Sequence, residues 1–269
     1  LRTVCARLME SPTVRSAGAE LVIRPSSVDR SIVIGRETSG ALSLSSSELG
    51  NLQEGFGTIV FGSAEGSHEI RIDTGSPGGT VTINDPVVFQ TQGNGGEVLI
   101  NSNLQVESLL VLGSGHTTML NSDVTATGTG ALADVKFFDA VVVQGTRQVK
   151  STNGSVLFSQ SMTTGAGGVN GDADTTADHL TVLAAQSVTF KEAVGGSNPL
   201  ESLTIGAANA KVTDVTFEKS VVIDGNLSIY ATGNVNFNAG VTINQGGSLR
   251  IFSANQVAFN GGELILNPI

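Results

Sequence analysis

Aromatic side chains are scarce in this chain of 269 residues, which has no Trp, one Tyr and 4% aromatic residues in all. A compact globular domain of this length usually buries large aromatic rings in its core. The apolar residues here are mainly Val, Ile, Leu and Ala, and the 11 Phe recur at regular places. This composition favours a narrow core lined by stacked β-branched side chains.

Charged residues are also few, at 14%, and the formal net charge is −10. Residues 1–36 hold six Arg and three acidic residues, about +3, which leaves 8 basic and 21 acidic residues, about −13, for the rest. A body this acidic repels phosphate backbones and anionic lipid, so we expect no nucleic acid partner. No run of about 18 apolar residues occurs, so we expect no membrane insertion. The single Cys5 excludes an internal disulfide framework and a Cys-based zinc site.

Short apolar runs, separated by Gly, Asn, Ser and Asp, follow one another from residue 21 onward, and most alternate apolar with small or polar residues. A Leu-x-Ile/Val triplet starts at residues 180, 203, 227 and 249, in steps of 23, 24 and 22. A Val-x-Phe triplet alternates with it, in steps of 21, 32, 27, 20 and 22, and its Phe residues are Phe137, Phe158, Phe190, Phe217, Phe237 and Phe259. Such periods are the signature of a stacked repeat.

The repeat predicts an all-β fold, a parallel β-helix (β-solenoid) of about 20–25 residues per coil and roughly eleven to twelve coils, about 55 Å long at a strand spacing of ~4.8 Å. Like residues then fall above one another, so we expect the six Phe in the interior, most of them in one stack, and Asn ladders in the turns. The longer steps of 27 and 32 are interpreted as coils with inserted loops. The alternative is an antiparallel β-sandwich, which needs no identical triplets at a coil-length period.

Residues 1–20 differ from the rest. Leu1, Val4, Cys5 and Leu8 lie at helical spacing, and Pro12 ends the pattern. We interpret 1–20 as a short N-terminal cap or as a linker, and 21–269 as one β-solenoid domain. A cap is favoured because an uncapped solenoid end exposes unpaired backbone groups.

Two stretches resemble a known family. They are residues 41–72, with Ala41-Leu42-Ser43-Leu44 and Gly55-Phe56-Gly57-Thr58-Ile59-Val60-Phe61-Gly62, and residues 187–205, with Ser187-Val188-Thr189-Phe190-Lys191-Glu192-Ala193-Val194-Gly195-Gly196. Both resemble repeats of filamentous-haemagglutinin-like large exoproteins of bacteria. The resemblance implies a right-handed β-helix in a secreted adhesive or structural surface protein, a stiff rod or fibre subunit and not an enzyme. A host or matrix glycan or protein is one expected partner. Independently of the resemblance, the apolar strand at residues 264–269, with no polar cap behind it, predicts that copies of the chain meet end to end.

The loop at residues 161–179 is the longest polar segment and contains a candidate calcium site. Asn170, Asp172 and Asp174 stand at positions 1, 3 and 5 of a loop, and Asp178 stands at position 9. Alternate acidic residues in a flexible loop direct oxygens to one point, as a hard cation requires. The match is incomplete, since position 12 is Thr181 in place of a bidentate Glu. The alternative is a solvated acidic loop, and no other cofactor is expected.

Two other functions stay open. Polysaccharide lyases and hydrolases also use β-helices, and a glycosidase needs two carboxyl groups ~5–9.5 Å apart. Asp73 with Asp85, or Asp214 with Asp224, could meet by stacking. A glycan-binding module that uses the 161–179 loop is the third possibility. The His residues, at 68, 116 and 179, have no metal-ligand spacing, and we expect His68 and His179 at the surface.

Overall fold

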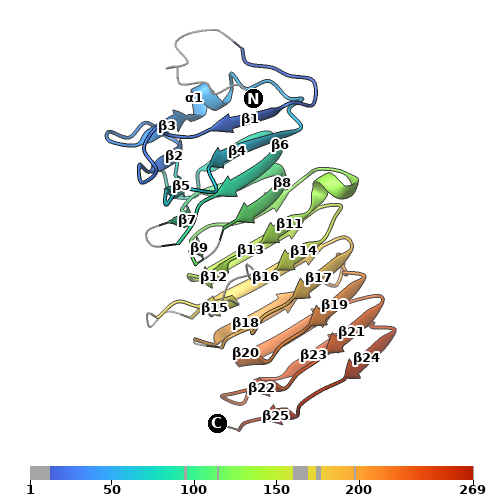
Figure 1. Ribbon diagram of the computed structural model, residues 1–269. Coiled ribbons are helices and arrows are strands. Elements are labelled where there is room, and N and C mark those ends of the chain that lie inside the picture. The colour runs from blue at the N-terminus through green and yellow to red at the C-terminus, as the bar shows by residue number, and fades with distance from the viewer. Residues whose placement is uncertain are drawn as a thin grey trace.

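The computed structural model describes residues 13–93, 96–113, 115–159, 169–173, 177–196 and 198–268. The chain is all-β, with long parallel sheets, an architecture compatible with a β-helix. Among the described residues the strand pairings are parallel, apart from an isolated antiparallel bridge between Ala207 and Ala210. Figure 1 shows the strands stacked from the N-terminal end to the C-terminal end, mostly in chain order, although β3 (Leu42–Ser45) lies outside β2 (Ile32–Gly35). We call one passage of the chain, from a strand to its next register partner, a rung.

The described strands form three ladders that run along the stack. The first consists of β1 (Glu20–Ile23), β4 (Thr58–Gly62), β6 (Thr80–Gln90), β8 (Asn103–Leu112), β11 (Val135–Phe137), β14 (Val156–Phe158), β17 (Ser187–Phe190), β19 (Asp214–Phe217), β21 (Asn234–Phe237) and β24 (Gln256–Phe259).

The long strands β6 and β8 bend into the second ladder, which continues through β10 (Val124–Ala126), β13 (Thr146–Ser151), β16 (His179–Ala184), β18 (Leu200–Ile205), β20 (Val221–Tyr230) and β23 (Leu249–Phe252). The third ladder contains β3 (Leu42–Ser45), β2 (Ile32–Gly35), β5 (Glu69–Ile72), β7 (Glu97–Ile100), β9 (Thr117–Leu120), β12 (Ala140–Val143) and β15 (Val169–Gly171), and continues through Val194, β20, β22 (Val241–Ile243) and β25 (Leu264–Leu266).

The predicted columns are confirmed. Alternate residues of each strand point inward, so Val156, for example, pairs with Val188 and both are buried. Five of the six predicted Phe are 0–4% exposed, and consecutive rings from Phe137 to Phe259 stack with centroids 4.9–5.4 Å apart. Phe259 in β24 is the exception, because 45% of it is exposed although it stacks on Phe237.

Two short helices interrupt the strands in the part of the chain that the structure describes. The helix α1 (Ser46–Leu49) begins with a capping box, in which the Ser45 hydroxyl accepts from the Glu48 N–H and the Glu48 carboxylate accepts from the Ser45 N–H. It follows β3, and both lie at the N-terminal end of the stack (Figure 1). The 3₁₀-helix η1 (Gly130–Ala133) lies between β10 and β11. Neither helix is predicted by the repeat.

The predicted cap at residues 1–20 lies largely outside the described residues, which begin at Thr13. Of its described part, Val14 forms a parallel bridge with Leu52, and the Val14 N–H donates to the Asn51 carbonyl at 2.9 Å. Strand β1 begins at Glu20. Residues 13–20 are therefore hydrogen-bonded into the stack.

Candidate functional site

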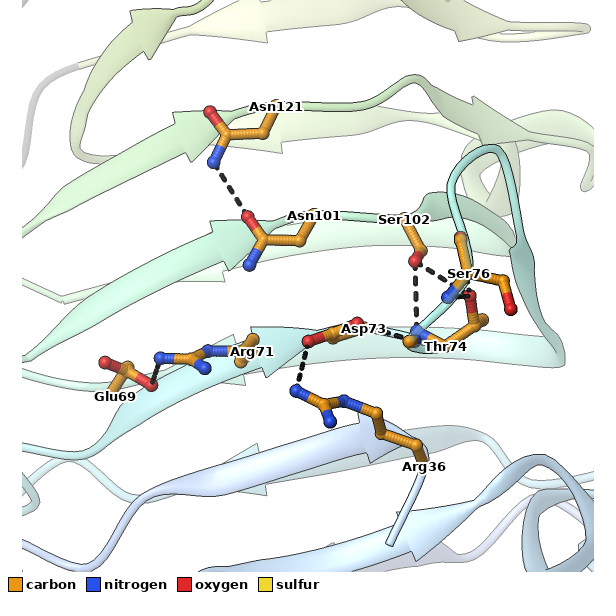
Figure 2. A network of polar contacts seen from close by, with 10 residues as sticks. Arg36, Glu69, Arg71, Asp73, Thr74, Ser76, Asn101, Ser102 and Asn121 are labelled. Atoms are coloured by element: carbon orange, nitrogen blue, oxygen red, sulfur yellow. Dashed lines mark hydrogen bonds and ion pairs between the residues drawn. The ribbon is translucent and has the colours of Figure 1, made fainter. Parts of the chain in front are cut away.

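A polar corner follows the ends of β2, β5, β7 and β9 in the third ladder. Arg36, just after β2, donates from its guanidinium to the carboxylate of Asp73, just after β5, at 2.8 Å (Figure 2). Asp73 Oδ1 also accepts from the Gly75 N–H at 2.7 Å, which fixes the turn into β6. Both carboxylate oxygens of Asp73 therefore have structural partners. On the outer side of β5, Arg71 forms a second ion pair with Glu69 at 2.7 Å.

Hydroxyl groups tie the next two rungs together at this corner. Ser102 follows β7 and is 1% exposed, and its Oγ accepts from the Thr74 N–H at 3.0 Å. The Thr74 hydroxyl lies 3.1 Å from Ser102 Oγ and 3.2 Å from the carbonyl of Ser76, which it can donate to (Figure 2). These contacts satisfy polar groups at a bend where the ladder hydrogen bonds stop.

Amide ladders continue the same corner, as the stacked repeat predicts. Asn121 donates from Nδ2 to Asn101 Oδ1 at 2.7 Å across one rung (Figure 2). Further along, Asn267 donates to Asn244 at 2.9 Å, and Asn244 donates to Asp224 at 2.9 Å. Asp224, whose carboxylate can only accept hydrogen bonds, is therefore the first residue of this second row of amides. The prediction of Asn ladders in the turns is confirmed.

The carboxylates considered for catalysis lie at separate bends of the rung. Asp73 follows β5, whereas Asp85 lies beyond the first half of β6 and is 3% exposed. Its Oδ1 accepts from the N–H groups of Gly55 and Phe56, both at 2.8 Å. In the other pair, Asp214 accepts from the Asn234 N–H at 2.7 Å, while Asp224 holds the amide ladder. All four carboxylates therefore hold neighbouring rungs in place.

The residues predicted to bind calcium are only partly described. Asn170 is half-buried in β15 and pairs in register with Val142, and Asp174 lies outside the described residues. Asp178 is 5% exposed, and its carboxylate accepts from the N–H groups of Gly145 at 2.6 Å and Asp172 at 2.8 Å. Asp178 thereby joins β15 to the turn before β13. In the described part of the chain, no three His, Asp or Glu side chains gather where they could hold a metal ion.

A polar cluster lies inside the core. His116 immediately precedes β9 and Asp139 immediately precedes β12, and the register pair Thr117–Ala140 places them on adjacent rungs. His116 Nε2 lies 3.1 Å from Asp139 Oδ2, and both side chains are fully buried. Thr118, also fully buried, donates its hydroxyl to the same oxygen at 2.5 Å. Burial raises the pKa of Asp139, and the contacts with His116 and Thr118 oppose that rise only in part.

The expectation that His68 lies at the surface is wrong. His68 is 1% exposed, its Nδ1 lies 3.0 Å from the Arg30 carbonyl, and burial lowers its pKa. His179 is half-buried in β16, with Nδ1 2.8 Å from the Ser202 hydroxyl. Sequence reasoning missed the buried cluster because it looked for local spacing between His residues. The signal that finds it is the repeat: residues 96, 116 and 139 each directly precede a strand of the third ladder.

The C-terminal rung carries most of the large apolar side chains that are exposed. They are Phe252, Val257, Phe259, Leu264, Ile265 and Leu266. Val257, Phe259, Leu264 and Leu266 continue core columns, since their register partners Val235, Phe237, Val241 and Ile243 are fully buried. The N-terminal rungs differ, because Leu21, Ile32, Leu44 and Leu49 are buried there.

Comparison of the chain with models of protein families, with curated proteins and with solved structures finds no match. Among the described residues there is no helix of the length and apolarity that crossing a membrane requires.

Proposed function

We propose that the chain is a stretch of right-handed parallel β-helix, with about 20–25 residues per coil, that works as a stiff rod or fibre subunit of a secreted, adhesive surface protein. The observation that carries the proposal is the ring column of the first ladder, in which each Phe from Phe137 to Phe237 is buried and stacks on the next.

The register supports the coil length. Val215 pairs with Val235, and Val235 pairs with Val257, so the numbering advances in steps of 20 and 22 from rung to rung. The step from Val156 to Val188 is longer and includes the 161–179 loop. Since each rung contacts mainly its neighbours, rungs add length without changing the cross-section. Parallel ladders, amide ladders and the ring column together resist bending of such a rod.

Surface exposure and adhesion follow from the resemblance of residues 41–72 and 187–205 to filamentous-haemagglutinin-like repeats. The corner contacts favour this role over catalysis. Hydrogen bonds connect adjacent rungs here, from Arg36 to Asp73 and between Thr74 and Ser102, and contacts of this kind stabilise a stack of rungs. The adhesive partner that we propose is a host or matrix glycan or protein.

Negative-stain microscopy of the purified chain tests the proposal. We expect isolated rods of about 55 Å, from a strand spacing of ~4.8 Å, or longer fibres of the same width. Compact spherical particles would overturn it. A crystal structure decides the hand, and binding to arrays of glycans and matrix proteins tests adhesion. Cleavage of a polysaccharide by the chain, lost in Asp73→Asn or Asp224→Asn, would replace this function by that of a carbohydrate-active enzyme.

A further inference from the structure

Polar residues occupy core positions near the middle of the stack. Thr118 lies in register between Val98 and Val141, which are both fully buried. The core therefore holds a hydroxyl where its neighbours along the ladder have an apolar side chain. His116 and Asp139 stand directly beside it. An apolar core solvates such groups poorly, and His116 Nδ1 and Asp139 Oδ1 have no hydrogen-bond partner among the described residues.

The charge of this cluster depends on how many protons the His116–Asp139 pair holds. With one proton the pair is neutral overall, either as imidazolium with carboxylate or as imidazole with carboxylic acid. Without that proton the core contains a net negative charge, and with two protons it contains a net positive charge. A buried net charge is costly, because the interior solvates it poorly. Because the two side chains are in contact, the number of protons belongs to the pair and not to either residue alone.

Other charged groups near the cluster point away from it. Glu97, which pairs with Thr117 on the adjacent strand β7, is exposed on the outer side of the sheet. Lys136 of β11 forms an ion pair at 2.8 Å with Asp134, and both side chains are partly exposed. Val141 and Val143 of β12 bring no charge inward. Within the described residues, the side chains that act on the pKa of Asp139 are His116 and Thr118.

We propose that His116, Thr118 and Asp139 form a pH-sensitive joint in the rod. The strands β9 and β12, which the cluster connects, pack most stably while the His116–Asp139 pair holds one proton. They open more readily when a second proton binds or when the last one leaves. The rod thereby gains a segment whose local opening follows the acidity of its surroundings, while the rungs from β19 to β22 have no such cluster among the described residues.

Amide hydrogen exchange of the whole chain between pH 4.5 and pH 9, corrected for intrinsic rates, tests the joint. We expect protection of the Leu120 and Val143 amides to pass through a maximum and to fall at least tenfold on each side, relative to amides of β21 and β22. The double variant His116→Gln/Asp139→Asn keeps similar shapes without titrating groups, and its profile should be flat. His68→Gln, which changes the other buried His, should keep the maximum. A flat profile in the unmodified chain, or a maximum that survives in the double variant, would overturn the proposal.

Thr118→Val gives a second, directional test, because it removes a donor to the carboxylate without adding a titrating group. The carboxylate is then less stabilised, so we expect the fall on the alkaline side to move to higher pH. Should the double variant not fold, NMR titration of the unmodified chain decides. The Asp139 carboxyl carbon and the His116 ring nitrogens should change in two shared steps. Independent single steps at ordinary values would contradict the joint.

Discussion

The rings of Phe217 and Phe237 lie within 3° of parallel, with centroids 5.1 Å apart. Both residues are buried, and both occupy the last position of a Val-x-Phe triplet in consecutive rungs of the first ladder. Parallel strands in register force this geometry, because the side-chain directions of paired residues repeat from rung to rung. The column is therefore a direct consequence of the register.

Removing one buried ring from the column should destabilise the protein. Phe237→Ala removes a fully buried ring that contacts Phe217 and Phe259, and we expect a loss of about 3–5 kcal/mol in the free energy of unfolding. Phe259→Ala is the matched control, since its ring is already 45% exposed, and it should cost clearly less. Denaturant unfolding of both variants measures the difference. Equal losses would contradict the burial of the column.

Acid should destabilise the chain partly through His68. Burial lowers the pKa of this imidazole below its ordinary value of about 6.5, so the folded state favours the neutral ring. The stability that results is present above pH 6.5 and is lost as the pH falls through the folded pKa.

His68→Asn should keep the donation to the Arg30 carbonyl from a nitrogen near the position of Nδ1, without a titrating ring. We therefore expect its free energy of unfolding to fall less steeply than that of the unmodified chain between pH 7 and pH 5. His179→Asn, at a half-buried position, serves as the control. Parallel slopes for His68→Asn and the unmodified chain would contradict the assignment.

The columns could be predicted from the sequence because they depend on a single period. The triplets at Val188, Val215 and Val235 repeat the same pattern of inward and outward residues, and the structure pairs them in that register. The Asn ladders follow from the same period, since Asn121 and Asn101 stand at equivalent places of adjacent rungs.

Features that do not repeat from rung to rung could not be predicted from the period. The capping box of α1 needs only Ser45 and Glu48, and a Ser-x-x-Glu pattern is common outside helices as well. His116 and Asp139 lie on two adjacent rungs, and the sequence indicates their contact only once the starts of β9 and β12 are aligned in register. The small residues before His68 favour a surface turn, yet its ring packs over Gly66, where a Cβ would lie 2.1 Å from Nε2.

Calcium binding by the loop from Asn170 to Asp178 stays a prediction. We expect calorimetry at millimolar calcium to give heat that is absent in Asp172→Asn and kept in Asp214→Asn, a matched loss of one carboxylate at a different bend. Asp178→Ala is less informative, because it also removes the acceptor of the Gly145 and Asp172 N–H groups and should destabilise the chain without calcium. No heat from the unmodified chain would remove the calcium site.

The exposed rung β23–β25 leads to the last prediction, that copies of the chain associate end to end. Leu264 and Leu266 are 44% and 57% exposed, although Val241 and Ile243 above them are fully buried. The outer backbone edge of these strands resembles other sheet edges, which pair readily with further strands. One further rung packed on this face covers the exposed leucines and the backbone edge. Either a second copy or a continuation of the chain supplies that rung.

Charge allows contact between opposite ends, because residues 1–36 carry about +3 while residues 238–269, with one Arg and one Glu, carry no net charge that would repel them. Such a contact does not close on itself and gives a filament. We expect light scattering of the native protein to increase with concentration, and Leu264→Lys/Leu266→Lys to abolish the increase. Thr216→Lys, which adds a charge on the outer side of the first ladder, should leave it intact. A native protein that stays monomeric at high concentration, with its own residues over this face, would leave an isolated rod in place of a filament.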